Sequence, residues 1–307
     1  MSENRVSHLL STKSLTKDTV ASILKQAQLY QDHFESGGAA KDDLKGKILA
    51  TLFFEPSTRT RLSFESAMLR LGGAITSMEG IHSSVKKGES LIDMGRILSG
   101  YADIVAMRHP TPHAVTEFAT KASVPVINAG DGANEHPTQA LLDLYTIQRE
   151  KGTLEGLKIG FLGDLKYGRT VHSLVALLEG YKNELHFISD PSLQIPDDKR
   201  QAITASGVSC VDHEHVSECI GELDVLYATR LQEERFEDRA LYERLSETYR
   251  ITPETIASAK EELCLLHPLP KINEIDPAVD KDPRAKYFDQ AQNGLYVRMA
   301  ILAELLG

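Results

Sequence analysis

The sequence predicts an α/β protein with two open parallel-sheet domains joined by a helix. Short, continuously apolar runs alternate with segments whose apolar residues recur every three or four positions, which indicates strands alternating with helices. The strands lack the apolar–polar alternation of a half-exposed sheet, as is typical of parallel sheets covered on both faces. The 307 residues are enough for two ordinary domains.

The first predicted domain spans residues 1–150. It opens with a helix that Ser14 or Thr16 caps and that ends at Gly37-Gly38. A longer helix from about Pro137 to Lys151 leads out of the domain and forms the connection. Between the two helices, strands are predicted at residues 47–54, 74–78, 103–107 and 124–128.

The second predicted domain spans residues 151–288, and we expect the apolar helix at about 289–307 to pack back on the first domain. The charged stretch 232–238 is predicted to be a surface loop. Ligands of open α/β sheets bind at the carboxyl ends of the strands, so those ends are the places to search for a site. In this domain the predicted strands are residues 157–163, 185–188, 206–211, 224–228 and 263–266.

Composition excludes several classes of protein. No apolar run approaches the length of a membrane span, and the N-terminus lacks the apolar core of a signal peptide. The net charge of −10 argues against a nucleic-acid-binding protein. Three cysteines without Cys-x-x-Cys spacing are interpreted as the reduced thiols of a cytoplasmic protein.

Two further patterns carry little weight. The run His213-Glu214-His215 lies near Cys210 and Cys219, but we interpret it as a solvated turn with incidental histidines rather than a metal site. The glycines at 160, 163 and 168 do not have the spacing of a dinucleotide-binding loop and are interpreted as a tightly packed strand-to-helix turn.

The stretch Phe53 to Glu65 carries the first functional signal. An apolar strand runs into Glu55-Pro56, and a helix with Ser57 at its N-cap follows. A helix N-terminus presents unpaired N–H groups and the positive end of the helix dipole. Because Arg59 and Arg61 add two cations to the first turn, the stretch predicts a phosphate site.

Three loops of the first domain are expected at the same sheet edge as this turn. Arg108 follows the strand 103–107, and a turn-rich Asn-Ala-Gly-Asp-Gly loop follows the strand 124–128. The connecting helix begins just after His136, and Gln139 lies one helical turn further on, so both side chains can face one site. Together these loops supply cations for a phosphate and donors for a carbonyl oxygen.

The second domain supplies two more arginines at strand ends, Arg169 and Arg230. Guanidinium binds carboxylate in a bidentate manner, so this pair suits a dicarboxylate ligand. The run His267-Pro268-Leu269-Pro270 follows another strand end. Its two prolines remove backbone donors and leave carbonyl acceptors, which suit an amide or an ammonium group.

These motifs resemble those of the aspartate and ornithine carbamoyltransferases, in the expected order and over nearly the whole chain. The resemblance rests on Phe-x-x-x-Ser-Thr-Arg-Thr-Arg, Met-Arg-His-Pro, Asn-Ala-Gly-Asp-Gly, His-Pro-Thr-Gln and His-Pro-Leu-Pro. It implies transfer of the carbamoyl group from carbamoyl phosphate to the α-amino group of L-aspartate, a step of pyrimidine synthesis, without a metal or organic cofactor.

The resemblance also implies a role for each site residue. Arg59 and Thr60 would hold the phosphate, with Ser57 and Thr58 as further donors. Thr60, Arg108 and His136 would surround the carbamoyl oxygen, and Gln139 would bind the carbamoyl amide. The backbone carbonyls of Leu269 and Pro270, joined by a cis bond, would accept from the amide and the incoming amine. Aspartate would be bound by Lys87, Arg169, Arg230 and Gln232.

Lys87 lies in a loop that resembles the family's mobile lysine loop, which reaches into the neighbouring subunit's site. The implied assembly is a homotrimer with shared active sites. The loop is a residue shorter than in some relatives, so either Ser83 or Ser84 would take the serine role. The resemblance leaves open whether regulatory chains or a higher assembly join the trimer.

Two alternatives to the aspartate branch are an ornithine-specific enzyme and a non-catalytic relative. Ornithine-specific members carry His-Cys-Leu-Pro and Ser-Met-Gly, whereas this chain has His267-Pro268-Leu269-Pro270 and Lys-Lys-Gly-Glu. A non-catalytic relative kept as an assembly domain would be expected to have lost some of the site residues, and all of those implied by the resemblance are present.

Overall fold

The computed structural model describes residues 8–79, 88–231, 233, 236 and 238–307. It divides into two compact units. Unit 1 contains Met1–Leu142 and Gln292–Gly307, and unit 2 contains Asp143–Ala291. Within the described residues, no helix combines the length and apolarity needed to cross a bilayer.

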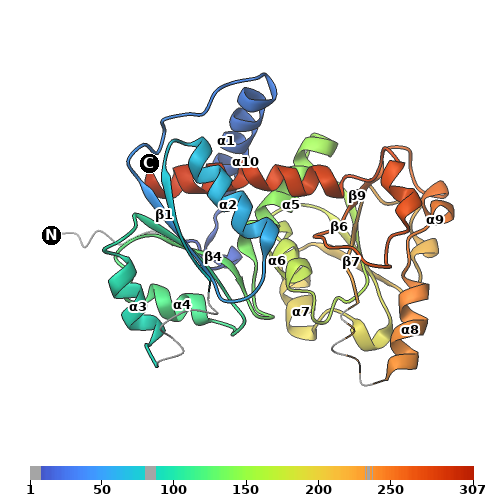
Figure 1. The fold of residues 1–307 in the computed structure, drawn as a ribbon. Coiled ribbons are helices and arrows are strands. Elements are labelled where there is room, and N and C mark those ends of the chain that lie inside the picture. The colour runs from blue at the N-terminus through green and yellow to red at the C-terminus, as the bar shows by residue number, and fades with distance from the viewer. Residues whose placement is uncertain (1–7, 80–87, 232, 234–235, 237) are drawn as a thin grey trace. The chain divides into compact units, whose positions relative to one another are not determined.

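Unit 1 is built on a four-stranded parallel sheet of order β2-β1-β3-β4. Figure 1 labels its strands β1 and β4. The chain passes from β1 to β2 on one side and then returns to place β3 on the other side of β1. This reversal of strand order leaves the carboxyl ends of β1 and β3 as neighbours with diverging connections, where open sheets bind ligands. The strands are β1 (Ile48–Phe53), β2 (Ala74–Glu79), β3 (Ile104–His109) and β4 (Val126–Asp131).

The helices of unit 1 follow the predicted pattern. The first begins after Thr16, whose side chain accepts from the Thr19 N–H, and the second ends before Gly72, whose φ is 80°. Phe64 of the second helix and Phe118 of the fourth are fully buried. The unit contains η1 (Thr12–Ser14), α1 (Lys17–Glu35), α2 (Thr58–Arg70), α3 (Leu91–Leu98) and α4 (Ala114–Ala119), with the start of α5 (Pro137–Lys151) and most of α10 (Tyr287–Leu306).

Unit 2 has a five-stranded parallel sheet of order β7-β6-β5-β8-β9. Its strand order reverses between β5 and β8. Phe161, Phe187 and Tyr227 are fully buried on the central strands, with the two phenylalanine rings stacked at 5.9 Å. The strands are β5 (Lys158–Leu162), β6 (Glu184–Ile188), β7 (Ser209–His213), β8 (Val225–Ala228) and β9 (Cys264–Leu266).

Helices and short helical turns connect the strands of unit 2. The predicted loop 232–238 is only partly described, and Asp238 caps the helix that follows it. The helical elements are α6 (Arg169–Leu178), η4 (Pro191–Leu193), α7 (Asp197–Ala205), η5 (Val216–Glu218), α8 (Arg239–Thr248), α9 (Pro253–Ala257) and η7 (Pro277–Lys281), beside the remaining parts of α5 and α10.

The predicted fold class is confirmed, with small corrections to the strands. The predicted strand 206–211 begins too early, because Ser206 caps α7 and Gly207 turns with a φ of 83°. The predicted strand 124–128 ends too early, because the ladder between β3 and β4 continues to the pair His109–Asp131. Both shifts move polar residues from loops onto the carboxyl ends of strands.

Candidate active site

The turn between β1 and α2 is the centre of the candidate site in unit 1. Ser57 occupies the N-cap position, and its side chain makes no capping hydrogen bond. Its carbonyl oxygen accepts the Arg61 N–H at 3.1 Å, so the first turn of α2 is closed. The N–H groups of Thr58, Arg59 and Thr60 precede the first intrahelical donor, which is the geometry that binds anions.

Two side chains of this turn differ in exposure. Thr60 is 8% exposed, and Arg59 is an exposed cation at the helix start. Desolvation by the surrounding protein lowers the pKa of Arg59, but an arginine titrates so far above neutrality that the guanidinium remains charged. Arg61 instead approaches Glu65 on its own helix at 3.5 Å. The exposed Arg59 therefore presents its charge at the N-terminus of α2.

Arg108 lies at the carboxyl end of β3, directly beside this turn. It is in register with Phe53 of β1, and its carbonyl oxygen accepts the Phe54 N–H at 2.9 Å. The guanidinium Nε is 2.6 Å from the carboxylate of Glu55. The charge of Arg108 is thus fixed across the junction of β1 and β3.

The loop after β4 is organised by the fully buried carboxylate of Asp131. It accepts hydrogen bonds from the side chain of Asn128 at 2.9 Å and from the backbone N–H of His113 at 2.9 Å and of Glu135 at 3.1 Å. Glu135 in turn accepts from the Ser11 hydroxyl at 2.6 Å. This network holds the loop against the N-terminal segment.

His136 and Gln139 lie where this loop enters α5. The backbone carbonyl of His136 accepts the Gln139 N–H at 3.0 Å, so the two residues share one helical turn. His136 is 4% exposed and Gln139 is half-buried. His109 and Asp131 pair at the carboxyl ends of β3 and β4. The loop from Asp131 to His136 therefore starts at the same edge of the sheet as Arg108.

In unit 2, both predicted arginines follow the strands that flank the reversal of strand order. Arg169 opens α6 after β5, and Arg230 follows β8. The loops after β5 and β8 approach each other closely at Gly163, where a side chain would not fit. The φ of Gly163 is 114°, and a Cβ there would lie 2.5 Å from the carbonyl oxygen of Thr229. The geometry gives a second cationic strand-end edge, suited to a carboxylate.

The His-Pro-Leu-Pro loop follows β9 in the same unit. The Leu269 N–H donates to His267 Nδ1 at 2.8 Å, so the ring proton lies on Nε2, which faces the Glu274 carboxylate at 2.8 Å. Burial acts to raise the pKa of Glu274, but His267 and backbone N–H groups outweigh it and lower the pKa. The Leu269–Pro270 bond is cis, as expected.

In each unit the predicted residues form a set that follows the carboxyl ends of neighbouring strands. Lys87 and Gln232 lie outside the described residues. Sequence reasoning missed the supporting carboxylates Glu55, Asp131 and Glu274, which hold the site's side chains and loops. Glu55 and Asp131 lie within two of the motifs and Glu274 lies just after a third, but nothing in the sequence indicated a supporting role for them. The set of unit 1 is Ser57, Thr58, Arg59, Thr60, Arg108, His136 and Gln139, and that of unit 2 is Arg169, Arg230, Leu269 and Pro270.

Two parallel α/β units, each with arginines at the carboxyl edge of its sheet, define a class of protein that binds small anions. Comparison with known families narrows this class. Residues 7–149 match the carbamoyl-P binding domain of aspartate/ornithine carbamoyltransferase, and residues 155–305 match its Asp/Orn binding domain. The chain belongs to the aspartate/ornithine carbamoyltransferase family, which confirms the predicted resemblance.

Several relatives and solved structures that it resembles are named as aspartate carbamoyltransferases. The aspartate carbamoyltransferase catalytic subunit of Methanospirillum hungatei is 47% identical over 98% of this chain and 100% of its own. The crystal structure of the catalytic subunit from Methanocaldococcus jannaschii has a TM-score of 0.92 and 48% identity, covering 97% of both chains. The Trypanosoma cruzi aspartate transcarbamoylase, solved with carbamoyl phosphate and aspartate, has a TM-score of 0.91 and 38% identity, covering 98% of this chain and 97% of that one.

Proposed function

We propose that the protein transfers the carbamoyl group of carbamoyl phosphate to the α-amino group of L-aspartate. The products are N-carbamoyl-L-aspartate and phosphate, in the synthesis of pyrimidines. The observation that carries the proposal is the cationic N-terminus of α2 beside Arg108, at the reversal of strand order in unit 1. Relatives in the aspartate branch, one of them solved with both substrates, support it.

The residues of unit 1 are assigned to carbamoyl phosphate. Thr58, Arg59 and Thr60 at the start of α2, with Ser57, bind the phosphate through N–H groups, hydroxyls and the guanidinium. Thr60, Arg108 and His136 donate to the carbamoyl oxygen, and Gln139 binds the amide. On this assignment residues 1–150 form the carbamoyl-phosphate-binding domain, with the C-terminal helix.

The residues of unit 2 are assigned to aspartate. Arg169 and Arg230 bind its two carboxylates, and the carbonyls of Leu269 and Pro270 accept from the amine and the carbamoyl amide. The family resemblance adds Lys87 and Gln232 to the aspartate ligands. On this assignment residues 151–288 form the aspartate-binding domain.

The reaction is an acyl transfer. The neutral amine of aspartate attacks the carbamoyl carbon, and the oxyanion that develops is stabilised by the donors Thr60, Arg108 and His136. The bond to the phosphate oxygen then breaks. The departing phosphate takes the proton of the amine, so no side chain has to act as the base. Positioning two anionic substrates among arginines supplies much of the rate.

The assay that tests the function compares aspartate with ornithine as acceptors while phosphate release from carbamoyl phosphate is followed. We expect rapid release with aspartate and none above background with ornithine. Release with ornithine alone would assign the protein to the ornithine branch. Failure with both acceptors, by folded protein, would favour a non-catalytic assembly role.

We also infer a cytoplasmic homotrimer in which Lys87 of one subunit completes the site of its neighbour. Lys87→Ala and His136→Ala homotrimers are each expected to be nearly inactive. When they are mixed, dissociated and reassembled, every hybrid ring contains an interface where an intact Lys87 meets an intact His136, so activity should return. Confirmed hybrids without activity, or an active monomer by light scattering, would contradict the shared site. The same light scattering reports any higher assembly with regulatory chains.

A further inference from the structure

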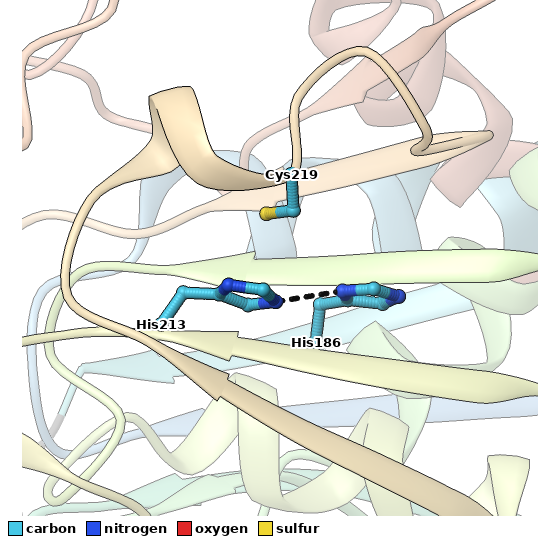
Figure 2. Close-up of side chains that lie close together, drawn as sticks. All are labelled: His186, His213 and Cys219. Carbon is cyan, nitrogen blue, oxygen red and sulfur yellow. Dashed lines mark hydrogen bonds between the residues drawn. The ribbon is translucent and has the colours of Figure 1, made fainter.

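The outer part of the sheet in unit 2 gathers three side chains that are typical metal ligands. His186 lies on β6, His213 on the edge strand β7, and Cys219 directly after η5 (Figure 2). One atom of each, two ring nitrogens and the sulfur, all lie within 4.8 Å of one another. We name these three residues the His–His–Cys cluster.

Strand register brings the two histidines together. Ile188 pairs with His213 and His186 pairs with Val211, so both rings stand on the same face of the sheet, one diagonal step apart. The rings are nearly parallel, 6° apart, and His186 Nδ1 is 2.9 Å from His213 Nε2. The turn η5 then returns the chain over this face and places Cys219, which is 3% exposed, above the two rings (Figure 2).

Both outer ring nitrogens face carboxylates. His186 Nε2 is 2.9 Å from Glu184, and His213 Nδ1 is 3.4 Å from Glu218. This is the arrangement of metal-binding histidines, whose second nitrogen donates to a carboxylate and fixes the tautomer. If both outer nitrogens carry the proton of a neutral ring, the two inner nitrogens point lone pairs at each other across 2.9 Å.

Facing lone pairs require a cation between them, either a proton or a metal ion. Cys219 supplies a third donor on the same side. A thiol and two imidazoles are a borderline-soft ligand set of the kind that binds zinc.

We propose that His186 Nδ1, His213 Nε2 and Cys219 Sγ form a binding site for Zn²⁺, with Glu184 and Glu218 as its supporting carboxylates. On binding, the Cys219 thiol releases its proton to solvent and the sulfur donates an electron pair, without a redox change. Ligand atoms around zinc stand roughly 3.3–3.6 Å apart, so the cluster closes with side-chain shifts of about 1 Å.

Water completes the coordination from an open cleft of about 640 Å³ that His213 and Glu218 help to line. The ion fastens the edge strand β7 and the η5 turn to β6. This site lies outside the strand ends to which we assigned substrates. It departs from the sequence interpretation of His213-Glu214-His215 as a solvated turn with incidental histidines, because His213 ends strand β7 and its ring faces His186.

The test is a zinc titration of the full chain, reduced and treated with chelator, against a chromophoric competitor. We expect one tightly bound equivalent per chain. Cys219→Ser and His186→Asn should each weaken binding by at least about tenfold, because each removes one of three ligands. Cys210→Ser is the matched control, since Cys210 lies on β7 but outside the cluster. Its affinity should equal that of the unaltered chain.

Two further measurements guard against a folding artefact. Circular dichroism in chelator establishes that each variant is folded, and the zinc-dependent rise in Tm should be lost in Cys219→Ser and kept in Cys210→Ser. Cobalt substitution should give a thiolate-to-cobalt absorption band that is absent only in Cys219→Ser. Unchanged zinc affinity in folded Cys219→Ser and His186→Asn, or no bound equivalent in the unaltered chain, would overturn the proposal.

Discussion

The guanidinium Nε of Arg108 lies 2.6 Å from the carboxylate of Glu55, an ion pair that joins the ends of two neighbouring strands. Glu55 belongs to the turn after β1, and Arg108 ends β3. Neither side chain is more than a quarter exposed, with relative accessibilities of 13% and 24%. The pair therefore orients an arginine that we assign to the carbamoyl oxygen, while Glu55 itself acts as a positioning residue.

Replacing the positioning carboxylate tests this relationship. Glu55→Gln keeps the shape of the side chain but removes the charge that holds Arg108, so kcat/KM for carbamoyl phosphate should fall about tenfold, the cost of one charge-assisted hydrogen bond. Steady-state kinetics with saturating aspartate measure it. Asp42→Asn, in the exposed pair with Lys45, is the control and should leave kcat/KM unchanged. Equal kinetics for both variants would show that Glu55 does not position Arg108.

The assignment of the phosphate site depends most strongly on Arg59. Arg59→Ala should reduce kcat by about 100- to 1000-fold, because it removes a cation that acts on developing charge. The fold should persist, since the side chain is exposed and surface substitutions usually change stability by less than about 0.5 kcal/mol. Arg70→Ala, at the other end of α2, is the matched control. Retention of most of the turnover number by Arg59→Ala would reject the assignment.

Arg230 is one of the two arginines that we assign to the carboxylates of aspartate. Arg230→Ala should raise the half-saturating aspartate concentration by roughly two orders of magnitude, the loss expected for a bidentate charged contact. The value for carbamoyl phosphate should change little. Initial rates over both substrate concentrations separate the two effects. Arg239→Ala, on the exposed start of α8, controls for the loss of a positive charge from the same unit. Similar shifts for both substrates would mean that Arg230 is not an aspartate ligand.

His172 gives unit 2 a pH dependence. Burial lowers its pKa from 6.5 to about 4, and its ring N–H donates to the Leu165 carbonyl oxygen at 2.7 Å. At a pH between these two pKa values, His172 is protonated in the unfolded chain but largely neutral in the folded chain. Stability should therefore fall as the pH drops from about 6.5 to about 4, by up to about 3 kcal/mol.

Urea unfolding at pH 7 and at pH 5 measures this loss. His172→Asn should be less stable than the unaltered chain at pH 7 but should lose less stability on acidification. His215→Asn, at an exposed position, provides the comparison and should keep the slope of the unaltered chain. An unaltered slope in His172→Asn would assign the acid sensitivity to other groups.

The elements of the fold were predictable because each strand is a continuous apolar run and each helix carries its own boundary signals. The helix after His136 begins at Pro137 and ends at Lys151, as predicted, because proline favours the first helical position. Strand order was not predictable, because apolar runs such as Ile104–Met107 do not specify which neighbour they pair with. The reversal of order between β1 and β3 emerges only in the assembled sheet.

The residues that support the sites could not be predicted from the sequence either. The cationic residues stand in recognisable motifs, but their partners are set by tertiary contacts. Nothing in the sequence joins Glu55 to Arg108, which are far apart along the chain. Likewise, the approach of His186 to His213 depends on the register of β6 against β7, and a shift of one residue would turn one ring to the opposite face.

The division of the chain has a consequence for biosynthesis. Unit 2 is one uninterrupted segment, Asp143–Ala291, whereas unit 1 needs residues from both sides of it, up to Leu142 and from Gln292 onward. A ribosome must therefore finish unit 2 before it releases the last helical turns that unit 1 requires. In unit 1, Ser22 on α1 donates to Glu304 on α10 at 3.3 Å, a contact between a helix translated before unit 2 and a helix completed after it. The inserted unit can fold during synthesis, and the unit that begins the chain is the last to be completed.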